Sequence, residues 1–141
     1  MHTVTLDTNI YVSALEFGGT PLRLLRMAVD HSIEITICQP IIDETRRVLQ
    51  DKFGWSEERL DEAEEWIRSF TRLVASGGEI DVIKEDPSDN RILECAEASG
   101  SAYIVSGDRD LLRVGRYGNA RIVKVAEMLE EVEGSEGRSP S

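Results

Sequence analysis

The chain has 141 residues, of which 40% are hydrophobic, 30% are charged and 6% are aromatic. The formal net charge of −11 argues against a broad basic surface that binds nucleic acid, but not against a carboxylate-rich metal site, whose cations would offset part of that charge. No apolar run approaches the roughly 20 residues of a membrane helix, and the N-terminal residues lack a signal-peptide pattern.

Hydrophobic periodicity divides the chain into alternating strands and helices. The first strand ends in Asp7 and is followed by a short helix. A second helix is expected to have Thr20 as its N-cap and Pro21 as its first residue, and Gly54 should end the third. The expected strands are 3–7, 33–38, 79–84, 102–106 and 120–123, and the expected helices are 8–15, 21–31, 40–53, 59–75, 86–99, 108–114 and 125–132.

This alternation predicts one α/β domain over residues 1–132, followed by a disordered acidic and polar tail over 133–141. We expect a central, mostly parallel sheet of about five strands with helices on both faces. In such sheets, ligands bind beyond the carboxyl ends of the strands, where the strand order reverses.

Two aspartates follow predicted strands at their carboxyl ends. Asp7 comes after Val4 and Leu6, and Asp108 comes just after the strand that ends at Ser106. If these strands are neighbours in the sheet, both carboxylates reach the same edge. Each aspartate is also a good N-cap for the helix that follows, so a purely structural role stays open for either residue alone.

Two further acids lie on helix faces that are otherwise apolar. Glu44 shares one side of its helix with Ile41 and Val48, so it must reach solvent, pair with an arginine or bind a cation. Asp89 shares a face with Ile92, but the helix dipole also favours an acid in the first turn. The structural alternatives are therefore a salt bridge for Glu44 and, for Asp89, a favourable interaction with the helix dipole in a helix that Asp86 caps.

Taken together, Asp7, Glu44, Asp89 and Asp108 come from four separate elements that could meet at one edge. Asp110 lies in the same short segment as Asp108, and its alternative role is a helix cap. Clustered carboxylates repel one another unless a cation compensates, and an all-oxygen site suits Mg²⁺ or Mn²⁺. No histidine has a partner at zinc-ligand spacing, and no glycine-rich phosphate loop is present.

These segments resemble the PIN-domain ribonucleases. The resemblance spans roughly residues 4–129 in the right order, and the subgroup most similar is the VapC-like toxins of prokaryotic toxin–antitoxin pairs. The segments that carry it are TLDTNIYVSAL, IIDETRRVL and EDPSDNRILECAEASGSAYIVSGDRDLL.

The resemblance implies metal-dependent hydrolysis of RNA phosphodiester bonds with Mg²⁺ or Mn²⁺, leaving 5′-phosphate and 3′-hydroxyl ends. It implies that Asn9 orients Asp7 or a metal-bound water, and that Ser106, where threonine is commoner, forms a hydrogen bond near the phosphate. The metal-binding and catalytic acids implied are Asp7, Glu44, Asp89 and Asp108, with Asp110 as a fifth metal ligand.

The resemblance also implies partners: an RNA substrate, an antitoxin protein that covers the acidic crevice, and a second copy in a homodimer. Isolated cysteines and the lack of a membrane segment favour the cytoplasm and no membrane partner. Several arginines could line an RNA path, or could serve only surface ion pairing. They are Arg23, Arg26, Arg46, Arg47, Arg109 and Arg113.

Two other functions fit parts of the pattern. One is a catalytically inactive PIN-like module that binds RNA or protein without turnover, which the presence of all four acids disfavours. The other is a phosphotransferase of the haloacid dehalogenase type. That family requires a second aspartate where this chain has Asn9.

Overall fold

The computed structural model describes residues 1–75 and 87–137, without the side chains of 87–89 and 135–137. The predicted strand 79–84 lies outside these residues, as does the end of the predicted tail. The strands are β1 (His2–Leu6), β2 (Ile33–Ile37), β3 (Thr71–Leu73), β4 (Tyr103–Val105), β5 (Arg116–Tyr117) and β6 (Ala120–Val123). The helices are α1 (Thr8–Phe17), α2 (Gly19–Val29), α3 (Gln39–Phe53), α4 (Glu57–Phe70), α5 (Pro87–Ser99), α6 (Arg109–Val114) and α7 (Val125–Gly137).

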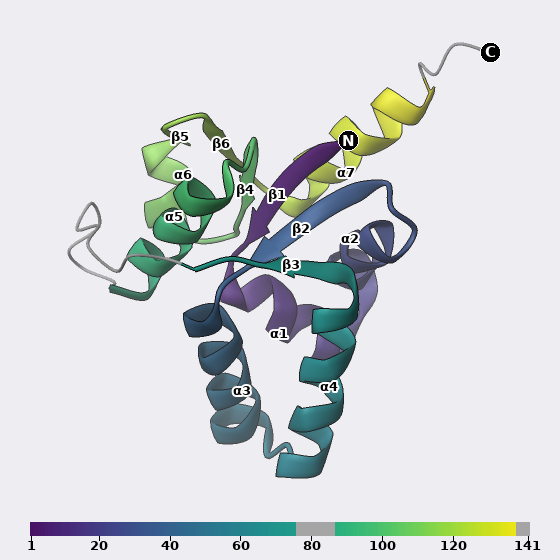
Figure 1. Ribbon diagram of the computed structural model, residues 1–141, viewed down its shortest axis with the longest axis vertical. Helices are drawn as coiled ribbons and strands as arrows, with labels where there is room; N and C mark the ends of the chain where they lie inside the picture. The colour runs from purple at the N-terminus through teal and green to yellow at the C-terminus, as the bar shows by residue number, and fades with distance from the viewer. Residues whose placement is uncertain (76–86, 138–141) are drawn as a thin grey trace.

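The described strands form one sheet in the order β3-β2-β1-β4-β6-β5, in which only the β5–β6 pair is antiparallel (Figure 1). Val4, Thr5 and Leu6 of β1 are all fully buried although they alternate between the two faces, so helices cover both faces. The predicted α/β fold is confirmed. Because β1 pairs with β4 and β2, the strand that leads to Asp7 lies in the middle of the sheet.

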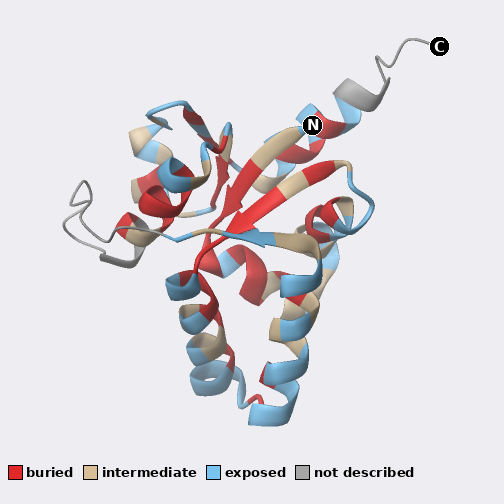
Figure 2. Ribbon diagram, in the orientation of Figure 1, coloured by how far each residue is buried: buried red, intermediate tan, exposed pale blue. Residues whose placement is uncertain are grey.

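Helices α3 and α4 form a hairpin that extends away from the sheet (Figure 1). Gly54 ends α3 in the left-handed conformation, as predicted, and Trp55 then packs into a small core with Val12. Burial follows the same division: the central strands are buried, whereas the outer sides of this hairpin are exposed (Figure 2).

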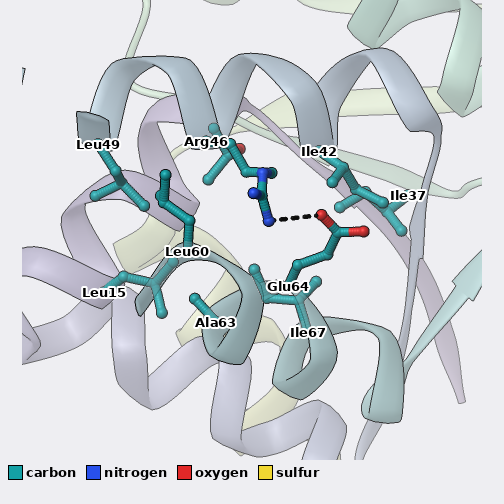
Figure 3. A pocket seen from close by; sticks show the side chains of 10 residues that line it. Leu15, Ile37, Ile42, Arg46, Leu49, Leu60, Ala63, Glu64 and Ile67 are labelled. Atoms are coloured by element: carbon teal, nitrogen blue, oxygen red, sulfur yellow. Dashed lines mark hydrogen bonds and ion pairs between the residues drawn. The ribbon is translucent and has the colours of Figure 1, made fainter. Parts of the chain in front are cut away.

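Arg46 joins the two helices of this hairpin by contacts with Glu57, Asp61 and Glu64 at 2.8–3.1 Å. Figure 3 shows the contact with Glu64. Its surroundings lower the pKa of Arg46 through desolvation, but the hydrogen bond and charge of Asp61 and the charges of the other two acids outweigh this effect and raise it overall. Arg46 is therefore committed to the hairpin.

Four elements differ most from the sequence expectations. The predicted helix 59–75 ends at Phe70, where Thr71 Oγ1 donates to the Ile67 carbonyl at 2.8 Å and the chain turns into β3. Residues 71–73 then pair with β2, and pairing with a distant strand overrides the helical spacing of Leu73.

The other three differences concern α2, α7 and β5. Gly18 rather than Thr20 precedes α2, because a φ of 77° at Gly18 lets the chain turn directly out of α1. Helix α7 runs to Gly137, into the segment expected to be a tail. Strand β5 was not predicted, because two residues are too short for a periodic signal. No helix in the described ranges is long and apolar enough to span a membrane.

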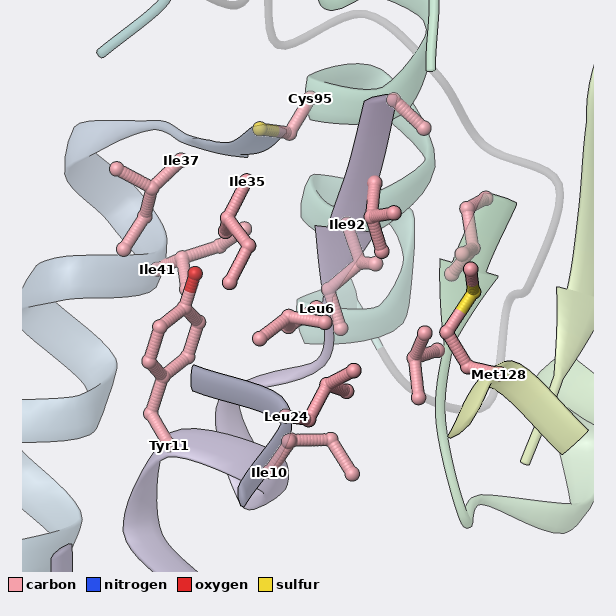
Figure 4. Close-up of a cluster of buried hydrophobic side chains, with 14 of the residues drawn as sticks. Leu6, Ile10, Tyr11, Leu24, Ile35, Ile37, Ile41, Ile92, Cys95 and Met128 are labelled. Atoms are coloured by element: carbon pink, nitrogen blue, oxygen red, sulfur yellow. The ribbon is translucent and has the colours of Figure 1, made fainter. Parts of the chain in front are cut away.

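The main core lies between the sheet and the helices, and the ring of Tyr11 lies in it beside Leu6, Ile37 and Ile41 (Figure 4). The Tyr11 ring is fully buried, and its hydroxyl has no hydrogen-bond partner among the described residues. Burial, with smaller contributions from the nearby Cys95 and Cys38, raises its pKa well above 10.0.

Cys38 and Cys95 are both fully buried, and they should resist alkylation in the folded protein. A hydrogen bond with Cys38 and burial both raise the pKa of Cys95, so its thiol form persists in mildly alkaline solution, whereas the thiolate is the reactive form. We expect no iodoacetamide adducts by mass spectrometry under native conditions and two adducts in guanidinium chloride. Rapid native labelling of either cysteine would contradict this packing.

Candidate active site

Asp7 occupies the turn between β1 and α1. Its backbone is extended (φ −62°, ψ 146°), and its side chain caps α1 because Oδ1 accepts a hydrogen bond from Asn9 N at 3.2 Å. The Asp7 amide donates to the carbonyl of Val105 on β4 at 2.9 Å. The structural role of Asp7 as an N-cap is thus confirmed, yet the residue is only 3% exposed at the sheet centre.

Ser106 links Asp7 to Asp108 across the β1–β4 edge. The buried Ser106 hydroxyl donates to Asp7 Oδ2 at 2.6 Å and accepts a hydrogen bond from Asp108 N at 2.9 Å. Because β1 and β4 pair in parallel with Leu6 opposite Val105, their next residues emerge side by side. The prediction that the Asp7 and Asp108 strands are neighbours is confirmed.

Asp108 caps α6 through one oxygen only. Oδ1 accepts hydrogen bonds from Asp110 N at 2.8 Å and from Leu111 N at 3.2 Å, and none of the described hydrogen bonds reaches Oδ2. Asp110 is not the cap that its alternative role required: it lies in the first turn of α6 and pairs with Arg113 at 3.4 Å. One oxygen of Asp108 therefore has no protein partner among the described residues.

An open pocket of about 480 Å³ lies beside this edge, and its size is within the roughly 300–1,000 Å³ typical of ligand pockets. Helix α1 provides one wall, and the turn from β4 into α6 provides the other. The lining residues are Asn9, Ile10 and Ser13 on the first wall and Gly107, Asp108, Arg109 and Asp110 on the second. The predicted residues Asn9, Asp108 and Asp110 are thus brought together.

Glu44 does not line this pocket, and the position of the Asp89 side chain is not described. Glu44 lies on α3 with 23% of its side chain exposed, and Arg47 Nη2 is 3.8 Å from its Oε1, so the expected salt bridge is present. Asp89 belongs to the first turn of α5, but its side chain lies outside the described residues. Within the described ranges, no group of three His, Cys, Asp or Glu residues is placed to hold a metal ion.

The donors that the edge does present are all oxygens: the carboxylates of Asp7 and Asp108 and the hydroxyl between them. The Ser106 hydroxyl links the Asp7 carboxylate to the backbone amide of Asp108, so both aspartates belong to the same edge, and a cation offsets the repulsion between carboxylates that gather at one site. Oxygen donors of this kind suit Mg²⁺ or Mn²⁺ and offer nothing to a thiolate- or imidazole-seeking metal. The described residues therefore fit part of a divalent-cation site.

The sequence analysis did not single out Glu94, a buried acid on α5. Its side chain is 2% exposed, and Arg91 Nη2 lies 3.0 Å from Oε1. A charged side chain between Leu93 and Cys95, within an apolar stretch of helix, was the available signal. The sequence analysis missed Glu94 because the apolar residues on the neighbouring face were enough to explain the helical pattern.

Comparisons with known proteins give the fold and the family of the chain. The chain is similar to the crystal structure of VapBC2 from Rickettsia felis bound to a DNA fragment from their promoter, with a TM-score of 0.61 and 15% sequence identity over 86% of this chain and 98% of that chain. No curated protein sequence matches it. The family model described as the PIN domain matches residues 3–110, which include β1, the β4–α6 turn and every predicted acid. The chain therefore belongs to the PIN domain family.

Proposed function

We propose that this protein is a Mg²⁺- or Mn²⁺-dependent endoribonuclease that hydrolyses RNA phosphodiester bonds. The observation that carries the proposal is the Asp7–Ser106–Asp108 arrangement at the carboxyl edge of β1 and β4, beside an open pocket, in a chain of the PIN domain family. Ligands of parallel α/β sheets bind at this edge.

The residues of this edge would have different roles. Asp7 and Asp108 would hold the cation, and Ser106 would fix the Asp7 carboxylate against the backbone of the turn that carries Asp108. Asn9 and Asp110 would line the path of the RNA strand. Family resemblance adds Glu44 and Asp89 as the remaining acids. The bound cation would neutralise charge that develops on the phosphate and make a water molecule easier to deprotonate.

We further propose that the protein is the toxin of a toxin–antitoxin pair and works as a homodimer in the cytoplasm. Support comes from the similarity in fold to VapBC2, which was crystallised on promoter DNA. An antitoxin segment carrying a basic side chain would suit an edge that presents Asp7 and Asp108. Buried thiols such as Cys38 and Cys95 stay reduced in the cytoplasm.

The test is cleavage of a panel of single-stranded RNAs by the purified protein with Mg²⁺, with Mn²⁺ and with EDTA. We expect cleavage with either metal, no cleavage with EDTA, and recovery when Mg²⁺ is added in excess. Single-stranded DNA of the same sequences is the control for substrate class. RNA that is bound but stays intact with both metals would overturn the proposal in favour of a non-catalytic binding module.

A further inference from the structure

The six arginines that were candidates for an RNA path differ in their ion pairs. Four of them are paired with carboxylates: Arg23 with Glu133, Arg46 with Asp61, Arg47 with Glu44 and Arg113 with Asp110. Arg26 and Arg109 are exposed and have no carboxylate within ion-pair distance among the described residues. Of these two, only Arg109 lines the pocket beside the acidic edge.

Arg109 stands next to the acids without pairing with them. It is the residue between Asp108 and Asp110, yet the hydrogen bonds of Asp108 go to backbone amides and Asp110 pairs with Arg113. A guanidinium whose donors are free of carboxylates in a pocket of this kind is suited to bidentate hydrogen bonds with the two non-bridging oxygens of a phosphodiester.

We propose that Arg109 binds a phosphate of the RNA strand that flanks the bond to be cut, and so positions the strand across Asp7 and Asp108. This inference rests on the proposed nuclease function. Arg109 would act on substrate binding rather than on the chemical step, because the cation held by the acids would neutralise the charge of the reacting phosphate. If Arg109 were only an exposed surface charge, its removal would leave RNA binding unchanged.

The experiment measures binding of a fluorescein-labelled single-stranded RNA by anisotropy, with Mg²⁺ present and with Asp7→Asn as the background so that turnover during the measurement is negligible. We expect Arg109→Ala to weaken binding about tenfold, the effect of one charge-assisted contact. Loss of one phosphate contact should also reduce the slope of log affinity against log salt by about 0.7 between about 50 and 200 mM salt. Arg109→Lys should retain the salt slope but only part of the affinity.

Arg26→Ala is the matched control, because Arg26 is also an exposed arginine but lies on α2 outside the pocket. It removes the same net charge and should leave affinity and slope unchanged. In the active protein, Arg109→Ala should raise KM for RNA about tenfold and leave kcat nearly constant, the signature of lost uniform binding.

Each outcome separates this inference from the proposed function. RNA binding that depends on Arg109 without any cleavage by the wild-type protein would overturn the nuclease and retain the phosphate contact. Cleavage with Arg109→Ala indistinguishable from Arg26→Ala would overturn the phosphate contact and retain the nuclease. Absence of RNA binding at every salt concentration would overturn both.

Discussion

Replacing Asp7 by asparagine should lower metal-dependent RNA cleavage by about 10³-fold, which corresponds to about 4 kcal/mol of transition-state stabilisation. Asparagine has nearly the same shape but no negative charge, so it weakens cation binding at the centre of the edge. Its amide oxygen can still accept the hydrogen bond from Asn9 N, so α1 keeps its cap. The fold should therefore survive while the activity does not.

Thermal unfolding provides a readout of Asp7→Asn that does not depend on activity. Mg²⁺ should raise the Tm of the wild-type protein, because a ligand that binds only the native state stabilises it. Mg²⁺ should shift the Tm of the variant less than that of the wild type, because the variant lacks one of the carboxylates proposed to hold the cation. Asp51→Asn, at an exposed position on α3, is the control. Cleavage by Asp7→Asn at the wild-type rate would falsify the assignment of this edge.

Tyr11 should show the largest effect on stability, and in opposite directions for two substitutions. Tyr11→Ala removes a fully buried ring from the main core and should cost about 3–5 kcal/mol of unfolding free energy. Tyr11→Phe keeps the ring and removes a buried hydroxyl without a partner among the described residues, so it should stabilise the protein by about 1 kcal/mol. Urea denaturation measures both.

The raised pKa of Tyr11 makes the difference in stability between the wild type and Tyr11→Phe depend on pH. Below about pH 10 the hydroxyl is protonated in both the folded and the unfolded chain, so ionisation does not affect stability. Above that pH the unfolded chain loses the proton and the folded chain does not, because burial raises the pKa. Wild-type stability should then fall by up to about 1.4 kcal/mol per pH unit relative to Tyr11→Phe. Tyr103 and Tyr117, whose pKa values are also raised, are common to both proteins and cancel. A Tyr11→Phe variant less stable than the wild type at neutral pH would mean that the hydroxyl has a partner.

The sequence by itself determined the order of the strands and helices around the edge and the placement of Asp7 and Asp108 at strand ends. Both results come from local chemistry. A β-branched or apolar run favours a strand, and an aspartate directly after it favours an N-cap, so each strand–aspartate–helix unit is encoded by adjacent residues. For the same reason Gly54 could be identified as the end of α3.

The interactions between distant segments could be seen only in the tertiary structure. The Ser106 hydroxyl that joins Asp7 to Asp108 acts across 99 residues, and β3 forms through pairing with β2, although its own residues continue a helical pattern. The ion pairs of the arginines likewise depend on which acids the fold places beside them. Arg46 pairs with Asp61 in the hairpin, whereas Arg109 lines the pocket. Propensity and periodicity describe a residue's neighbours in the chain, whereas ion pairs, buried polar contacts and edge strands depend on neighbours in space.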